Sequence, residues 1–377
     1  MILSQEHQML RDAVRQYARE QLAPNAATWD RDATFPKEAL KGLAAMGLYG
    51  VAIPEEWGGA GMDHTALALA LEEIAIGDGA TSTIVQVNNL AAGILLGYGT
   101  PAQKERYLKP LARGDTLGAF ALTEPHTGSD ASAIRTRAER SGDSYVLDGV
   151  KQFITSGKYA DVAVVFAVTD KDAGKKGISA FVVPTTAPGY VVARVEEKTG
   201  QHASDTAQIV FEGCRIPAAN LLGTEGEGYR IALANLESGR INVAAQSVGM
   251  AQSALDAAIR YARERTTFGK PLIEHQAVNF RLADMATGIE AARQLYLHAA
   301  ALRDRGLPCL KEASMAKLFA SEAAEKVCSD AIQIHGGYGY LRDFPVERIW
   351  RDVRVTQIYE GASDIQRMVI GRSLAGG

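Results

Sequence analysis

A single carboxylate near the C-terminus, Glu360, lies between apolar neighbours and a glycine. Ser363 and Gln366, three residues apart, form the pattern of a capping box, which predicts that a helix starts at Ser363. Glu360 then lies in a short turn before that helix. Because apolar surroundings make a carboxylate costly to ionise, we expect its pKa to rise, which suits a general base acting on a carbon acid. An ordinary surface glutamate in a loop is the alternative.

A polar segment in the middle of the chain, residues 120–130, contains Phe120, Leu122, Thr123 and Ser129. The two hydroxyls and the backbone amides around them can bind the polar edge of a heterocycle or a phosphate chain. A polar connection between a strand and a turn is the simpler alternative.

Residues 149–157 place Phe153 beside Ile154 and Thr155. An aromatic ring next to a hydroxyl can stack on a flavin and hydrogen-bond to it. The alternative is a β-strand with one buried aromatic residue.

Residues 223–228 contain three glycines, but their order is wrong for a dinucleotide fingerprint and no strand–helix–strand unit follows. A Rossmann fold is therefore not expected. The long helix predicted after them carries Leu236, Glu237 and Arg240. Taken alone, Arg240 is consistent with a solvated helix charge.

A further segment combines Arg265 and Phe268 with a Gly-Lys-Pro helix break, and Gln276 follows it. Arginine can grip a pyrophosphate through a bidentate contact. We interpret His275, which precedes Gln276, as structural rather than catalytic.

The end of the next predicted helix carries Gln333, Gly336 and Gly337. Glycines let backbone approach a ligand closely, although a glycine C-cap followed by a loop is the alternative.

Taken together and in this order, these segments resemble the acyl-CoA dehydrogenases, flavoenzymes that oxidise a fatty acyl-CoA to its 2,3-enoyl form. The matching segments spread over residues 120–367, and the helical N-terminal part fits the family layout. Some members carry the base on the long helix, immediately before the arginine that matches Arg240. Here that position is Gly239, so only Glu360 fills a family base position.

The resemblance implies that Glu360 removes the α-proton of a thioester. It implies an FAD site formed by Phe120, Leu122, Thr123, Ser129, Phe153, Ile154, Thr155, Arg265, Phe268, Gln276, Gln333, Gly336, Gly337, Ala362 and Asp364. It implies substrate contacts from Ser129, Leu236, Glu237, Arg240, Tyr359 and Gly361. Electron-transferring flavoprotein would accept the electrons, and neighbouring subunits of a homotetramer, a dimer of dimers, would share the flavin site. No metal site is expected.

Three positions depart from the commonest family pattern. Phe153 stands where many members have Trp, Ala362 where many have Thr, and Asp364 where many have Gln. Phe153 and the run from Gly239 to Ile241 resemble members that act on short or short branched acyl chains. An acyl-CoA oxidase, a non-catalytic flavin or acyl-CoA binder and a ligand-free helical scaffold are the alternatives. The chain is short for the usual oxidase with its extra C-terminal domain.

The composition is that of an ordinary soluble protein, with 377 residues, 47% of them hydrophobic, and a formal net charge of −4. This charge does not favour nucleic-acid binding, and no apolar run is long enough to span a membrane. Three cysteines lie far apart, which argues against a zinc site or a disulfide framework and suggests a reducing, cytoplasmic setting. A first helix beginning at about Ser4 leaves no room for a targeting peptide.

The spacing of hydrophobic residues changes along the chain, which predicts three regions of secondary structure that position these residues. Residues 1–115 are predicted to form an N-terminal helical domain with starts at Ser4, Asp63 and Thr100. Residues 116–225 are predicted to form an antiparallel β-domain, with strands at 117–123, 144–147, 162–168, 178–184, 190–195 and 206–211. Residues 226–377 are predicted to form a four-helix-bundle type of domain, with helices at 229–266, 272–305, 311–336, 346–354 and 363–374. The fold class is thus a multidomain α+β protein.

Overall fold

The computed structural model describes residues 3–376. The N-terminal part consists of helices, namely α1 (Gln5–Tyr17), α2 (Ala23–Asp32), α3 (Lys37–Ala45), α4 (His64–Gly77), α5 (Gly79–Tyr98), α6 (Pro101–Gln103) and α7 (Lys109–Arg113). The predicted helix starts are confirmed. Ser4 caps α1, Asp63 caps α4, and Thr100 forms a complete capping box with Gln103.

A β-sheet forms the middle part. Its strands are β1 (Gly118–Ala121), β2 (Arg137–Ser141), β3 (Ser144–Thr155), β4 (Val162–Val168), β5 (Ile178–Pro184), β6 (Tyr190–Val195), β7 (Thr206–Pro217) and β8 (Leu221–Leu222). Their order is β6-β7-β3-β2-β4-β5-β8, and β1 pairs with β4. Most pairs are antiparallel as predicted, but β1 runs parallel to β4, and β2 meets β4 in parallel at one position, so the sheet is mixed.

Strands β2 and β8, the extension of β7 to Pro217 and the full length of β3 were not predicted. The sequence of β2 is polar, with only Ala138 buried, so it lacks the apolar alternation of a strand. The short strand predicted at residues 144–147 continues to Thr155, beyond Gly149. A Cβ at Gly149 would lie 2.6 Å from Thr136, the residue before β2. The absence of a side chain therefore allows this close approach, and β3 continues through the glycine instead of ending there.

A helical bundle forms the C-terminal part. It contains α8 (Gly228–Glu264), α9 (Gln276–Asp304), α10 (Leu310–His335), α11 (Pro345–Val353) and α12 (Ser363–Leu374), and a hairpin of β9 (Thr266–Thr267) and β10 (Lys270–Pro271) separates α8 from α9. Its core is rich in buried alanines from α8, α9 and α10, which allow close helix packing. At Gly249 a Cβ would lie 2.2 Å from the Glu72 carbonyl oxygen, so α8 and α4 cross with their backbones almost in contact.

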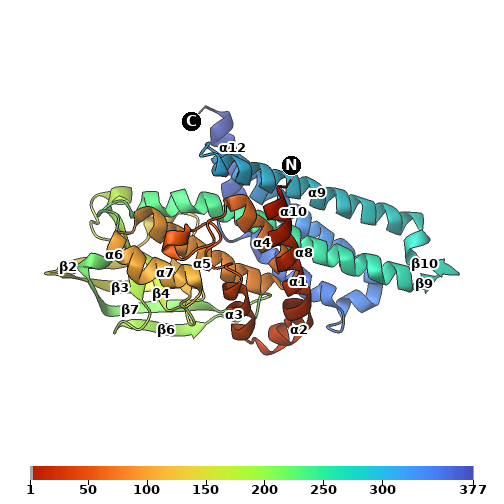
Figure 1. The fold of residues 1–377 in the computed structure, drawn as a ribbon, viewed down its shortest axis with the longest axis horizontal. Coiled ribbons are helices and arrows are strands. Elements are labelled where there is room, and N and C mark those ends of the chain that lie inside the picture. Colours follow the sequence, from red (N-terminus) through yellow and green to blue (C-terminus); the bar gives the residue numbers. More distant parts are fainter. Residues whose placement is uncertain (1–2, 377) are drawn as a thin grey trace.

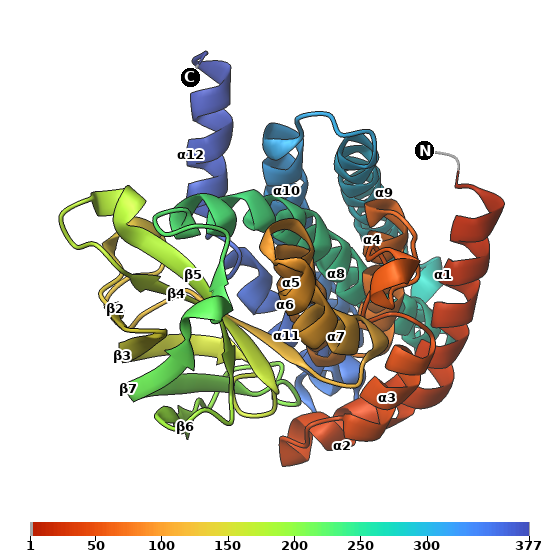
Figure 2. The same cartoon turned by 60° about the vertical axis from the view of Figure 1, so that its left-hand side comes forward.

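The sheet and the β9–β10 hairpin lie at opposite ends of the longest axis of the molecule (Figure 1). Helix α5 is buried on nearly all sides and packs against both β1 and α8. Helix α12 projects away from the body of the bundle (Figure 2). No helix in the described part of the chain has the length and apolarity that crossing a membrane requires.

Candidate active site

Glu360 lies in the turn between α11 and α12, as the sequence predicts. A 3-10 turn (Arg354–Gln357) follows α11, and Glu360 and Gly361 then adopt left-handed conformations with φ of 54° and 86°. Left-handed backbone is unusual for a residue with a side chain and costs about 1–3 kcal/mol, so the surrounding structure must hold it. The strain marks Glu360 as a candidate functional residue.

The turn is held differently from the predicted capping box. Helix α12 does begin at Ser363, but its N-cap is Ala362, without a side-chain hydrogen bond, and the Ser363 hydroxyl has no partner among the described residues. Gln366 is fully buried, and its side-chain amide donates to the carbonyl oxygens of Glu360 (3.1 Å) and Gly361 (2.7 Å). The capping box is therefore wrong, because Gln366 binds the turn and not the end of the helix.

The Glu360 carboxylate has one bonded and one free oxygen. Oε1 accepts a hydrogen bond from Gln86 on α5 at 3.2 Å, whereas Oε2 is buried and has no partner among the described residues. A Cβ at Gly239 on α8 would lie 2.6 Å from Oε2, so the absence of a side chain there makes room for the carboxylate. Burial raises the pKa of Glu360, although Gln86, Arg240 and Lys317 each oppose this.

Two cations flank this carboxylate. Arg240 is 6% exposed, and its Nε and Nη1 have no partner among the described residues. Burial lowers its pKa from the usual value. Lys317 on α10 is fully buried, and burial lowers its pKa to about 8. Buried polar atoms without partners are rare, so Oε2 and the Arg240 nitrogens point to a ligand that completes the site.

Tyr359 ties the turn to the rest of the molecule. Its hydroxyl donates to Gln246 on α8 at 3.1 Å, and burial raises its pKa to about 12. Nearby, the Thr83 hydroxyl donates to the Gln201 side chain at 2.8 Å, and the backbone N–H of Gln201 donates to Asp352. Gln201 also has a left-handed backbone, with φ of 52°.

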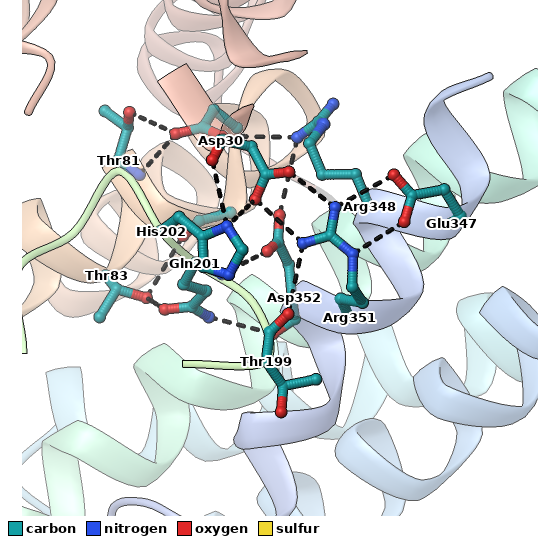
Figure 3. A network of polar contacts seen from close by, with 12 residues as sticks. Asp30, Thr81, Thr83, Thr199, Gln201, His202, Glu347, Arg348, Arg351 and Asp352 are labelled. Carbon is teal, nitrogen blue, oxygen red and sulfur yellow. Dashed lines mark hydrogen bonds and ion pairs between the residues drawn. The ribbon is translucent and has the colours of Figure 1, made fainter. Parts of the chain in front are cut away.

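Figure 3 shows the polar network that contains Gln201 and Asp352. Arg348 lies 3.5 Å from Asp78 at the start of α5 and 3.6 Å from Asp352, and Arg351 binds Asp30 on α2 at 2.6 Å. The network therefore joins the N-terminal helices, the loop between β6 and β7, and α11.

The segment from β1 to Ser129 and the C-terminal end of β3 carry the first group of predicted flavin residues. Lys151 is fully buried, and its ammonium donates to the Leu122 carbonyl at 2.9 Å and to Glu124 at 2.8 Å. This bond holds the two segments side by side. Phe120 is half-buried, with its ring 5.2 Å from that of Phe166.

Phe153 is 62% exposed and has a left-handed backbone, with φ of 60°, so it is not the buried strand aromatic of the alternative reading. The buried hydroxyl of Ser156 nearby has no partner among the described residues. An exposed ring and a free hydroxyl fit a flat polar cofactor such as a flavin. The remaining predicted residues here are buried Ile154, half-buried Thr123 and Thr155, and exposed Ser129.

The second group of predicted flavin residues lies by the β9–β10 hairpin, which is at the end of the molecule away from the sheet (Figure 1). Arg265, Gly336 and Gly337 line a cavity of about 430 Å³, and no atom lies within 4 Å of a Cβ built on either glycine. Phe268, in the hairpin, is 98% exposed. Gln276 and Gln333 are exposed near this end. This open arginine site fits a pyrophosphate, but the structure does not bring it together with the first group within one chain.

Other predicted residues have different surroundings. Glu237 accepts from Arg303 at 3.1 Å and from the Cys309 thiol at 3.2 Å, so protein partners already bind its carboxylate. Leu236 is half-buried on α8, and Asp364 is exposed on α12. His275 lies 3.1 Å from the Thr267 carbonyl, in keeping with a structural role in the hairpin.

All three cysteines are free and buried. Within residues 3–376, no group of His, Cys, Asp and Glu side chains is placed to hold a metal ion.

Several contacts of the site were missed from the sequence, namely Gln86, Lys317 and the side chain of Gln366. One signal was present for Lys317. It falls on the same face of α10 as Ala313, Ala320 and Ala324, all buried, so its helical position places a charge on a face of small core residues.

Comparisons with known proteins agree with this architecture. Profiles of the acyl-CoA dehydrogenase N-terminal, middle and C-terminal domains match residues 4–115, 119–214 and 226–375. The mitochondrial short-chain specific acyl-CoA dehydrogenase of Homo sapiens is 48% identical over 373 residues, which is 99% of this chain and 90% of that protein.

Solved structures give the same result. Butyryl-CoA dehydrogenase from Megasphaera elsdenii superposes with a TM-score of 0.98 and 41% identity, covering 100% of this chain and 99% of the other. The prolyl acyl carrier protein oxidase AnaB superposes with a TM-score of 0.95 and 34% identity, covering 99% of this chain and all of the other.

The helical, β and helical order of this chain is that of the three matched domain profiles, and the matched relatives are oxidoreductases that act on CH–CH bonds. The chain belongs to the acyl-CoA dehydrogenase family, which confirms the resemblance and the fold class inferred from the sequence.

Proposed function

We propose that this enzyme dehydrogenates a short or short branched-chain acyl-CoA at its α and β carbons to give the trans-2-enoyl-CoA. The observation that carries the proposal is the free, buried Oε2 of Glu360, which lies in the space left by Gly239. A carboxylate that burial makes more basic, with one oxygen unbound, is suited to remove a proton from carbon.

Each neighbouring group has a role in this proposal. Gln86 holds Oε1 and so directs Oε2 toward the substrate. The backbone N–H of Glu360 donates to the thioester carbonyl, which stabilises negative charge on that oxygen by several kcal/mol, on the order of 3. Arg240, whose guanidinium has free N–H groups, faces the coenzyme A part.

FAD, when bound, supplies the acceptor for the β-hydrogen. Phe153 and the Thr123 and Thr155 hydroxyls would hold the flavin ring, while Arg265, Phe268 and the backbone at Gly336 would hold the pyrophosphate and adenosine half. Because the first group belongs to the sheet and the second lies by the hairpin at the other end of the molecule, we infer that the second group serves a neighbouring subunit. A homotetramer built as a dimer of dimers would satisfy this.

The proposed electron acceptor is electron-transferring flavoprotein, and the proposed setting is the cytoplasm, where three free cysteines stay reduced. Molecular oxygen is the second candidate acceptor. AnaB, an oxidase that this chain matches over its full length, is a reason not to exclude an oxidase on chain length alone.

The test is anaerobic mixing of the purified yellow protein with a panel from butyryl- to palmitoyl-CoA, together with isobutyryl- and 2-methylbutyryl-CoA. We expect the flavin colour to bleach fastest with acyl chains of about four to six carbons, with modest steps of roughly 1–3 kcal/mol per methylene. Bleaching fastest with palmitoyl-CoA would contradict the proposed chain length, and no bleaching with any member would contradict dehydrogenation. Oxygen consumption during turnover would favour the oxidase.

A further inference from the structure

Lys317 is a fully buried lysine whose ammonium faces the turn that carries Glu360. Its Nζ donates to the Gly361 carbonyl oxygen at 2.7 Å. Among the described residues, no carboxylate oxygen lies within 4.0 Å of Nζ. Burying an ammonium costs several kcal/mol even with good partners, so its position inside the bundle needs a compensating role.

The carbonyls that Lys317 and Gln366 bind belong to the strained part of the turn. Gly361 oxygen accepts from Lys317 Nζ and from Gln366 Nε2, both at 2.7 Å, and Glu360 oxygen accepts from the same amide at 3.1 Å. Donors from α10 and α12 thus fix two successive peptide groups, which is the kind of restraint that a left-handed glutamate requires.

The charged groups that act on Lys317 lie on α8, on α10 and in the turn. Arg240 on α8 and Glu322 on α10 act on it together with Glu360. Gln366 on α12, which binds the same Gly361 carbonyl, and Gln86 on α5, which binds Glu360, are neutral. Glu322 is itself paired with Arg367 on α12 at 2.6 Å.

We propose that Lys317 is a positioning residue for Glu360, acting through the Gly361 carbonyl and through its charge to keep the carboxylate in the space beside Gly239. The inference rests on the proposed role of Glu360 as the base. Lys317 does not contact the reacting atoms in this account. It sets where the base lies and how readily the base ionises.

The test compares three variants of the flavin-loaded protein with the parent. Lys317→Met keeps an apolar side chain of similar length and loses the donor and the charge. Gln366→Met loses the other donor without changing charge. Lys326→Met is the matched control, because Lys326 is an exposed lysine on the same helix. The measurements are the anaerobic bleaching rate with butyryl-CoA across pH, and hydrogen exchange of residues 354–366 without substrate.

For Lys317→Met we expect unchanged flavin content, faster exchange in the turn and a bleaching rate lower by roughly 10²-fold, as for a misplaced catalytic group. The rising limb of the pH profile should move to higher pH, because loss of the cation favours the neutral acid. Gln366→Met should speed exchange without moving the pH profile, and Lys326→Met should match the parent.

The proposal would be overturned if the pH profile of Lys317→Met were the same as that of the parent protein. It would also be overturned if neither the Lys317 nor the Gln366 substitution changed hydrogen exchange in the turn. Glu360→Gln separates this failure from failure of the proposed function. If the parent protein is bleached and Glu360→Gln is not, the base assignment stands whatever Lys317 does. If the parent is not bleached by any acyl-CoA, the proposed function fails, and the exchange measurement still tests the restraint.

Discussion

At the scale of single residues, the site depends on the absence of a side chain at Gly239. The three atoms nearest to a Cβ at this position all belong to the Glu360 carboxylate. Glycine in the middle of a helix is otherwise unfavourable by about 0.5–1 kcal/mol relative to alanine. Alanine would therefore favour helix stability at this position, whereas the placement of the Glu360 carboxylate requires glycine.

Gly239→Ala tests this conflict. We expect the protein to fold and keep its flavin, while the added methyl pushes the carboxylate aside and lowers the bleaching rate by roughly 10²-fold. The rate is measured by anaerobic mixing with butyryl-CoA. Gly97→Ala, an exposed glycine of α5 with open space around it, is the control. Equal rates in the two variants would show that Gly239 does not make room for the base.

At the scale of elements, the sequence predicts the location of Glu360 and the bounds of α12, because both depend on local patterns. It assigns the wrong role to Gln366, because that side chain has a tertiary partner that local sequence does not specify. Gln86 and Lys317 could not be paired with Glu360 for the same reason. Their contacts depend on how α5 and α10 pack around α8.

The β9–β10 hairpin carries exposed residues that the proposed shared flavin site would cover. Arg265 lines a cavity, and Phe268 is almost entirely exposed. A large exposed aromatic beside an arginine is typical of a surface that another molecule covers. The resemblance predicts a shared flavin site here, which a single chain cannot display.

Arg265→Ala should therefore reduce flavin content and weaken subunit assembly together, because one contact supports both. Flavin absorbance per chain and sedimentation velocity are the two measurements. The control is Arg263→Ala, which removes an exposed arginine from the last turn of α8. Full flavin content and unchanged sedimentation in Arg265→Ala would contradict the shared site.

At the scale of the whole molecule, the network in Figure 3 connects the three parts of the chain. Asp352 is buried at its centre, and burial raises its pKa to about 7, with Asp78 adding to the effect and Arg348 opposing it. Because the folded state favours the protonated acid, the contribution of Asp352 to stability is complete below the ordinary pKa of aspartate and is lost as pH rises toward 7.

Asp352→Asn cannot ionise but keeps an oxygen for the Gln201 N–H. We expect the free energy of unfolding of this variant, relative to that of the parent, to be more favourable at about pH 8 than at about pH 5, by on the order of 2 kcal/mol. Urea unfolding at both pH values measures this difference, and Asp172→Asn in an exposed turn is the control. A difference that does not change with pH would contradict the ionisation of Asp352 in this range.

The central claim is that Glu360 removes the α-proton, and Glu360→Gln tests it most directly. The amide is nearly isosteric, so FAD and acyl-CoA should still bind. On anaerobic mixing with a good acyl-CoA, the flavin should bleach more slowly than in the parent by more than the ~10²–10⁴-fold usual for loss of a general base, because a thioester carbon acid ionises so poorly without help. Bleaching within roughly tenfold of the parent rate, far short of the loss expected for a general base, would contradict the assignment.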